Sequence, residues 1–157
     1  KVGRRQRQSC IRGGWTDPFP IAAGLLHRQA IARSHGLPPV LMHADTPFQP
    51  SPGVGFASAD AHADQLARAL GWQVCRVPAN PSGLCVPACP KGHRRVNNRP
   101  GAARDWCPDT DRHQATVMLA SQPDVVLAFL TPDADVTRET VHLAKAMGIE
   151  VIALEAP

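Results

Sequence analysis

The chain contains no tyrosine, and its 157 residues include only four phenylalanines and three tryptophans. A hydrophobic core must therefore be built from aliphatic side chains. No run of 18 apolar residues occurs and no basic-then-apolar leader opens the chain, so neither a membrane span nor a secretory signal is expected. We therefore expect a cytoplasmic protein. Apolar residues make up 43% and charged residues 19%, which predicts a single globular domain over residues 1–157 rather than a disordered chain.

Lysine is also scarce, since most of the 17 basic residues are arginine, and the formal net charge is +4. This bias towards arginine, alanine and proline is typical of a high-GC genome. Basic residues gather near the N-terminus and within residues 91–104, a stretch without a single acid. Such patches attract nucleic acid or phosphorylated ligands. A solvated surface explains them equally well.

Short apolar runs alternate with helical patterns along most of the chain. The run at 125–130 is continuous and lies between two prolines, which is typical of a strand buried on both faces. The predicted strands are 40–42, 72–77, 125–130 and 149–154, and the predicted helices are 20–34, 60–70 and 137–147. This alternation predicts an α/β fold, a Rossmann-like three-layer sandwich around a mostly parallel sheet.

Local signals mark the ends and faces of these elements. Asp60 is expected to cap the helix 60–70, and Asp135 or Thr137 the helix 137–147. Gly71 and Gly148 are expected to end the same two helices. The four-residue spacing of three apolar side chains indicates the helix 20–34; these are Ala22, Leu26 and Ala30. Two cysteines in or beside predicted strands are expected to be buried, namely Cys10 and Cys75.

Residues 78–110 do not follow the alternation and are predicted to be an irregular insert, rich in proline, arginine, glycine and cysteine. Four potential metal ligands lie within it: Cys85, Cys89, His93 and Cys107. Three thiolates and one imidazole can close a tetrahedral zinc site with no open position, so we predict a structural Zn²⁺ ion. An insert with so few apolar residues needs a bound metal, or a similar cross-link, to be ordered.

Two alternatives to zinc remain open at this stage. The thiols could be unliganded, or Cys107 could form a disulfide with Cys85 or Cys89. If zinc is bound, Arg94 and Arg95 directly follow the histidine ligand and are expected to offset the negative charge of the thiolates. They would also present a basic rim to a partner.

Three loops are expected at the carboxyl edge of the sheet, where parallel sheets bind ligands: 13–17, 43–45 and 131–137. The order of elements and these loops resemble the SLOG superfamily of Rossmann-like nucleotide-ligand proteins, in particular its YspA-like branch. That branch has a glycine turn followed by an aromatic residue and Thr-Asp, a His-Gly motif, a Gly-Ala-Asp helix start, an Arg-Asn pair and a glycine-rich phosphate loop. The matching segments are Gly13 to Asp17, His43 to Asp45, Ser58 to Asp60, Arg112-His113 and Asp133 to Thr137.

This resemblance implies a nucleotide or a nucleotide-derived ligand, bound by a sensor or accessory protein. The residues it assigns to the ligand are Gly13, Gly14, Trp15, His43, Asp60, Arg112 and Thr137. Some actinobacterial members of the branch carry a similar cysteine-rich insert, which supports the metal prediction. No convincing catalytic constellation is present. If the protein is an enzyme, the resemblance implies a hydrolase acting on a nucleotide derivative.

The family's loop glycines are replaced here by Ala44, Ser58, Asp133, Ala134 and Val136. Glycines in such loops let backbone N–H groups approach a phosphate closely. The carboxylates at positions 133 and 135 add repulsion, since a like charge about 4 Å away costs about 4 kcal/mol at an effective dielectric of 20. We therefore predict weak binding of simple nucleotides unless a divalent cation is present.

Structural roles for His43 and Asp60 also remain open, as a satisfied core histidine and a helix cap. A second functional class remains as the alternative. In that class the α/β domain is only a scaffold, and the zinc-stapled insert with the basic N-terminus contacts nucleic acid or a protein partner. Either class allows an oligomer, and neither involves a membrane.

Overall fold

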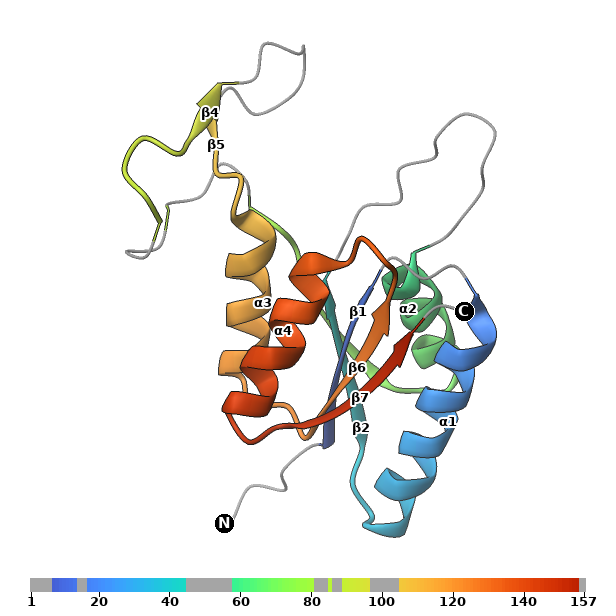
Figure 1. The fold of residues 1–157 in the computed structure, drawn as a ribbon. Coiled ribbons are helices and arrows are strands. Elements are labelled where there is room, and N and C mark those ends of the chain that lie inside the picture. The colour runs from blue at the N-terminus through green and yellow to red at the C-terminus, as the bar shows by residue number, and fades with distance from the viewer. Residues whose placement is uncertain are drawn as a thin grey trace, which may run out of the picture.

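Five parallel strands form the centre of the described molecule, in the order β3-β2-β1-β6-β7 (Figure 1). The computed structural model describes residues 7–13, 17–44, 58–80, 85, 89–96 and 105–155. The strands are β1 (Arg7–Gly13), β2 (Pro39–Ala44), β3 (Gln73–Val77), β6 (Val125–Leu130) and β7 (Glu150–Glu155). The predicted α/β class and the parallel sheet are confirmed.

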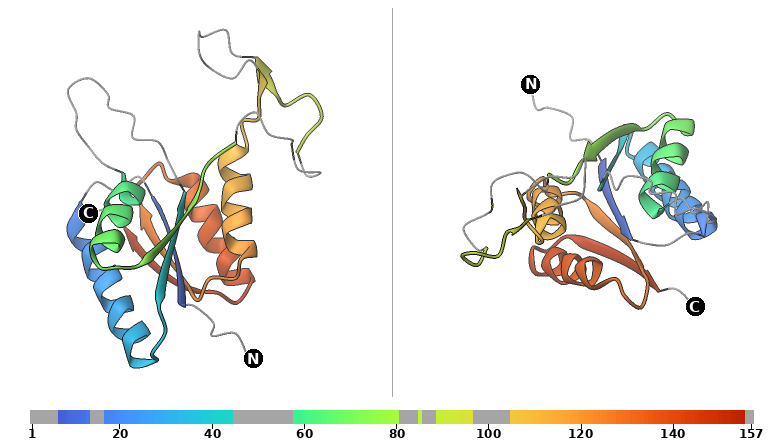
Figure 2. Two further views of the ribbon diagram at one scale, coloured as in Figure 1. Left: turned by 180° about the vertical axis from the view of Figure 1, so that it is seen from behind. Right: turned by 90° about the horizontal axis from the view of Figure 1, so that it is seen from above.

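Helices cover both faces of this sheet, as Figures 1 and 2 show. In the described part of the chain they are α1 (Pro18–Ser34), α2 (Ala59–Ala69), α3 (Thr110–Ala120) and α4 (Asp135–Ala146). Helices α1 and α2 pack on one face, around Leu41 and Phe129. Helices α3 and α4 pack on the other, around Met42 and Val126. Neighbouring residues of β2 and β6 therefore point into different halves of the core.

Strand β6 is buried along its whole length, because β1 and β7 pair with its two sides and helices cover its two faces. Its six residues are all apolar, which matches the continuous hydrophobic pattern of a central parallel strand. The prediction of this strand from residues 125–130 is confirmed.

The helix ends agree with the glycine predictions and correct the capping predictions. Gly71 and Gly148 follow α2 and α4 with φ values of +75° and +72°. Ser58, rather than Asp60, caps α2, because its hydroxyl oxygen accepts the N–H of Ala61 at 3.3 Å. The prediction for Asp60 was wrong: this residue lies inside the first turn and is 3% exposed.

The capping prediction for α4 was also wrong. The N-cap position is Ala134, and no side chain makes a capping hydrogen bond there. Asp135 is already the first helical residue, and its side chain is 90% exposed. Thr137 lies in the first turn and is buried. Capping by a side chain depends on the conformation of the loop before the helix, which residue types alone do not specify.

Helix α1 begins two residues before the predicted start, because Asp17 accepts the N–H of Phe19 and Pro18 occupies the first helical position. The buried face of α1 is also shifted by one residue towards the N-terminus from the apolar positions that were predicted to face the core. Ile21 and Leu25 are completely buried, whereas Leu26 is 51% exposed. The apolar residues of α1 surround the helix, so their spacing alone did not identify the face that packs on the sheet.

Within the described residues of the predicted insert, a two-residue antiparallel pairing joins β4 (Arg95–Val96) and β5 (Asp105–Trp106). In Figures 1 and 2, this pair lies beyond the first turn of α3 and away from the sheet. The absence of regular structure was therefore wrongly predicted for these four residues, and also for Thr110, where α3 begins. Helix α3 itself was not predicted, because its buried side includes Thr110 and Gln114.

Cys75 is exposed, which corrects its predicted burial. It lies on β3, which pairs only with β2 in the described sheet and so is packed less closely than the central strands. The side chain of Cys10 lies outside the described residues. Among the described helices, none has the length and apolar character needed to cross a membrane.

Candidate metal centre

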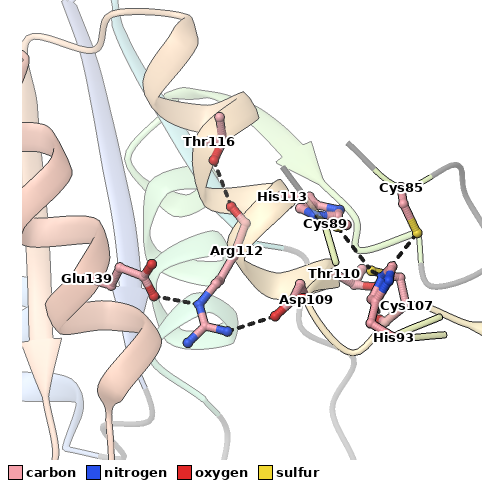
Figure 3. Close-up of polar contacts among 10 residues, drawn as sticks. All are labelled: Cys85, Cys89, His93, Cys107, Asp109, Thr110, Arg112, His113, Thr116 and Glu139. Atoms are coloured by element: carbon pink, nitrogen blue, oxygen red, sulfur yellow. Dashed lines mark hydrogen bonds and ion pairs between the residues drawn. The ribbon is translucent and has the colours of Figure 1, made fainter. Parts of the chain in front are cut away.

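Four side chains of the insert converge on one point (Figure 3). They are Cys85, Cys89, His93 and Cys107, whose ligand atoms all lie within 4.8 Å of one another. Cys107 is 2% exposed, and the other three are partly buried. Because these residues are separated by up to 22 positions, only folding of the insert brings them together. The predicted set of four ligands is thus one cluster in the structure.

The distances within the cluster suit a tetrahedral ion. The Sγ atoms of Cys85 and Cys107 lie 3.2 Å and 3.1 Å from Nε2 of His93. The Sγ atoms of Cys89 and Cys107 are 4.0 Å apart. Metal–ligand bonds of about 2.3 Å to sulfur and about 2.0 Å to nitrogen would place a sulfur and a nitrogen ligand about 3.5 Å apart, and two sulfur ligands about 3.8 Å apart, in a tetrahedron. The observed S···N separations are slightly shorter than this and the S···S separation is slightly longer, so each lies within about 0.4 Å of the tetrahedral value.

The predicted disulfide alternative does not fit the described cysteines. Cys75, Cys85, Cys89 and Cys107 are all free thiols. The 4.0 Å between the Sγ atoms of Cys89 and Cys107 is about twice the length of a disulfide bond, which is about 2.05 Å. The arrangement therefore favours metal binding by thiolates.

Groups around the cluster orient and neutralise the ligands. Nδ1 of His93 lies 2.5 Å from the carbonyl oxygen of Pro90, so an N–H donated there leaves Nε2 free to bind a metal. Arg94 donates to Sγ of Cys85 at 3.3 Å and forms an ion pair with Asp105 at 2.9 Å. The Cys85 contact, followed by Asp105, raises the pKa of Arg94 above its usual value.

This contact places Arg94 where it can offset the charge of a Cys85 thiolate, as expected for the zinc-bound site. Arg95 is exposed in β4.

His113, on α3, is a further neighbour of the cluster, because its Nε2 lies 3.1 Å from Sγ of Cys89. Sequence reasoning assigned His113 to the Arg-Asn motif and overlooked it as a neighbour of the metal ligands. Its position six residues after Cys107 was the available signal.

Among the described residues, those predicted to bind a nucleotide lie on both faces of the sheet. Gly13 ends β1, in register with Phe129 of β6, whereas Gly14 and Trp15 lie outside the described residues. His43 is 2% exposed, and its Nε2 lies 3.2 Å from a carboxylate oxygen of Asp64 on α2. This contact supports the structural role that was left open for His43.

Asp64 is the centre of a charged network on the α2 face. Its carboxylate accepts two hydrogen bonds from Arg76, at 3.0 and 3.1 Å, and one from Arg68 at 2.9 Å. The Arg76 bonds, helped by those from Arg68 and His43 and opposed by burial, hold the pKa of Asp64 far below its usual value. The carboxylate therefore stays ionised and can hold the imidazole of His43 in place.

Arg112 lies on α3 and reaches across to α4. Its guanidinium donates to Glu139 at 2.6 Å and to Asp109 at 2.8 Å, and both contacts, Glu139 first, raise its pKa. A small groove of about 40 Å³ lies beside it, lined also by Val136 and Glu139. Thr137 is buried in the first turn of α4 and does not line this groove. A larger groove of about 280 Å³ between α1 and α2 contains none of the predicted ligand residues.

The two carboxylates at the start of α4 have different surroundings. Asp133 accepts a hydrogen bond from the hydroxyl of Thr131 at 2.8 Å, which lowers the pKa of its carboxyl group, and Asp135 is directed to solvent. Arg138 donates to the carbonyl oxygens of Thr131 and Pro132. The loop thus combines two acids with one arginine at an end of α4 that no side chain caps.

No protein-family model matches the chain, and no curated protein matches it. The resemblance to SLOG proteins therefore rests on the motifs of this chain alone.

Proposed function

We propose that the protein is a zinc-stabilised, Rossmann-like domain of the SLOG kind, which binds a nucleotide-derived ligand at the carboxyl edge of its sheet. The strand order carries this proposal. From β1 the chain builds outward through β2 and β3 on one side, and through β6 and β7 on the other. In doubly wound sheets, ligands bind where the strand order reverses in this way, which is here between β1 and β6.

The surroundings of that position support an anionic ligand. The first turn of α4 follows β6 after a short loop and has no side-chain cap, so its N–H groups are suited to a phosphate. Arg112 and Arg138 supply cations on α3 and α4. The nearby Asp133 and Asp135 oppose binding. We therefore expect affinity to rise when a divalent cation accompanies the nucleotide.

Calorimetric titration with ATP and with inorganic phosphate, each with and without Mg²⁺, tests the ligand. Arg112→Ala should weaken ATP binding about 10- to 100-fold, the effect of losing a charge-assisted hydrogen bond. Arg33→Ala, an exposed arginine in the last turn of α1, is the control and should bind normally. If neither ATP nor phosphate binds under any of these conditions, and mass spectrometry finds no retained nucleotide derivative, the proposal is wrong.

The metal in this proposal is Zn²⁺, because three thiolates and one imidazole form a closed set that suits it. Thiolates also fit the reducing cytoplasm expected from the sequence. When bound, Zn²⁺ supplies folding free energy to the insert rather than a reactive water, since the protein fills all four positions. Elemental analysis should find about one equivalent in native protein.

Cys107→Ser should lose most of this zinc, whereas Cys75→Ser should keep it, because Cys75 is exposed on β3 and takes no part in the cluster. Reduced native protein that contains well under half an equivalent of zinc, and gains none on addition, would contradict the metal assignment. So would a native disulfide between two of the four ligands.

A second candidate function is the binding of nucleic acid by the insert. The observation that favours it is the position of β4 and β5 beyond the end of α3, with Lys91 and Arg95 exposed (Figure 2). Binding of random oligonucleotides should then fall steeply with salt, because counterions are released from phosphates. Lys91→Glu with Arg95→Glu should abolish it. Salt-independent binding, or no binding, would reject this function.

A further inference from the structure

We propose that helix α3 belongs to the metal site, so that metal binding and the ordering of the first two turns of α3 are a single event. His113 is the positioning residue that links them, through a hydrogen bond to the thiolate of Cys89. The inference rests on the proposed zinc site and extends it. It assigns to the metal a role in the α/β domain, in addition to its role within the insert.

The first link is the main chain of Cys107. Its carbonyl oxygen accepts the hydroxyl of Thr110 at 2.6 Å and the N–H of the same residue at 3.3 Å. Cys107 and Thr110 are both buried. The N-cap residue Asp109 makes no side-chain capping bond, so these contacts hold the start of α3. A ligand that is bound to the metal thus also fixes the helix start.

The second link is the side chain of His113. It projects from α3 towards Cys89 in Figure 3, and its Nε2 lies 3.1 Å from Sγ of that residue. His113 is not among the four residues whose ligand atoms lie within 4.8 Å of one another. It is therefore placed as an N–H donor to a ligand, a contact that orients the thiolate and disperses its charge.

Helix α3 also forms side-chain hydrogen bonds with the sheet and with α4. The side-chain amide of Gln114 donates to the carbonyl oxygen of Val77, the last residue of β3. Arg112, next to His113, donates to Glu139 of α4. Metal binding therefore bears on the position of Arg112, a proposed ligand residue. Loss of the metal should release the first turns of α3 and disturb this pair.

Hydrogen exchange of the native protein, with bound Zn²⁺ and after chelation, tests the coupling directly. We expect faster exchange of amides in the first half of α3 after chelation, with little change in β6 and in the second half of α4. Because this comparison uses only the native chain, it does not depend on whether a variant folds. Unchanged exchange in α3 would overturn the coupling.

Zinc affinity measured by competition with a chelator tests His113. His113→Ala should weaken binding about 10- to 100-fold, as expected when a hydrogen-bond partner of a metal ligand is removed. His113→Gln, which keeps an N–H donor, should recover part of the loss. His142→Ala is the matched control, since His142 is an exposed histidine on α4. Native affinity in His113→Ala would overturn the role of His113.

The absorption spectrum of the Co²⁺-loaded protein distinguishes a hydrogen-bond donor from a ligand. His113→Ala should keep the bands of a tetrahedral sulfur-rich site, whereas Cys107→Ser should change them. A change of coordination in His113→Ala would also overturn the assignment. Failure of the native chain to bind Zn²⁺ or Co²⁺ would instead reject the zinc site on which the inference rests.

Discussion

At the scale of single residues, two side chains that sequence motifs treated as ligand candidates are engaged by polar partners within the fold. His43 is buried against Asp64, and Arg112 is engaged by Glu139 and Asp109. Asp64 shows why such contacts matter, because one carboxylate serves a buried imidazole and two arginines. Its contribution to stability should be measurable.

Asp64→Asn should lower the free energy of unfolding by about 1–3 kcal/mol, because it removes charged hydrogen bonds and weakens the partner of a buried imidazole. Arg68→Ala removes one exposed ion pair spaced four residues apart, so its cost should be only about 0.3–0.5 kcal/mol. Urea unfolding of both variants measures the difference. An equal effect of the two would contradict a central role for Asp64.

The pH dependence of this effect follows from the lowered pKa of Asp64. A carboxyl group whose pKa is lower in the folded state stabilises the protein above its unfolded pKa, which is about 3.9. That contribution is lost as the pH falls towards the folded pKa. The stability difference between native protein and Asp64→Asn should therefore be constant from pH 5 to 7 and shrink below about pH 4.

The loop before α4 offers a second prediction at this scale. Replacing Asp133 and Asp135 together by glycine should strengthen phosphate binding about tenfold or more, since each nearby charge costs about 1 kcal/mol even in water. Asp124→Gly, an exposed acid at the other end of β6, controls for net charge. Calorimetry with inorganic phosphate is the measurement. Unchanged or weaker binding in the double variant would place the anion elsewhere.

At the scale of elements, β6 and α3 represent opposite cases. The strand is apolar throughout and buried, so its sequence and its environment agree. The helix buries Thr110 and Gln114 beside Met118 and Leu119, so its sequence lacks a clear apolar stripe. Its polar residues are satisfied by the ends of other elements: Thr110 by Cys107 and Gln114 by Val77.

Val126→Asp should prevent folding, because it places an unpaired charge at a fully buried position between the sheet and two helices. The expected cost exceeds about 4 kcal/mol, a large part of the stability of a domain of this size. Val117→Asp, at a 60% exposed position of α3, should change stability by no more than about 0.5 kcal/mol. Cooperative thermal melting of soluble Val126→Asp would contradict the assigned core.

At the scale of the whole molecule, the chain combines a body held by hydrophobic burial with an insert held by polar and sulfur contacts. Two apolar clusters lie on the two faces of the sheet. In the insert, three cysteines and His93 instead form the candidate metal cluster, and Arg94 donates a hydrogen bond to it. These two parts should therefore respond differently to removal of metal.

Chelation should make residues 85–107 sensitive to protease while β1, β2 and β6 stay folded. Thermal stability should also fall, since a ligand present at 100 times its dissociation constant adds about 2.7 kcal/mol to the folded state. Limited proteolysis and thermal melting with and without chelator measure the two effects. Cys107→Ser is the control and should not respond to chelator. Complete unfolding of the sheet on chelation would contradict the separate stabilisation of the body.

Sequence alone determined the features that depend on neighbours along the chain. The apolar run of β6, the glycines that end α2 and α4, and the close spacing of Cys85, Cys89 and His93 are all local patterns. Strand and helix periodicity reports which side chains can be buried, so the alternation of elements was also predictable. The four candidate metal ligands were recognised because three cysteines and a histidine within a proline- and glycine-rich stretch are typical of a metal site.

Only the tertiary structure decided which long-range partners these residues meet. Asp64 contacts His43, which lies 21 positions away in the sequence, and His113 contacts Cys89, which lies 24 positions away. Both contacts depend on how helices α2 and α3 pack in the fold. Cys75 is exposed because its strand is an outer one, and α1 buries Ile21 and Leu25 rather than Leu26. Periodicity leaves such choices open, since several faces of an element can be apolar enough and packing selects the one that buries most surface.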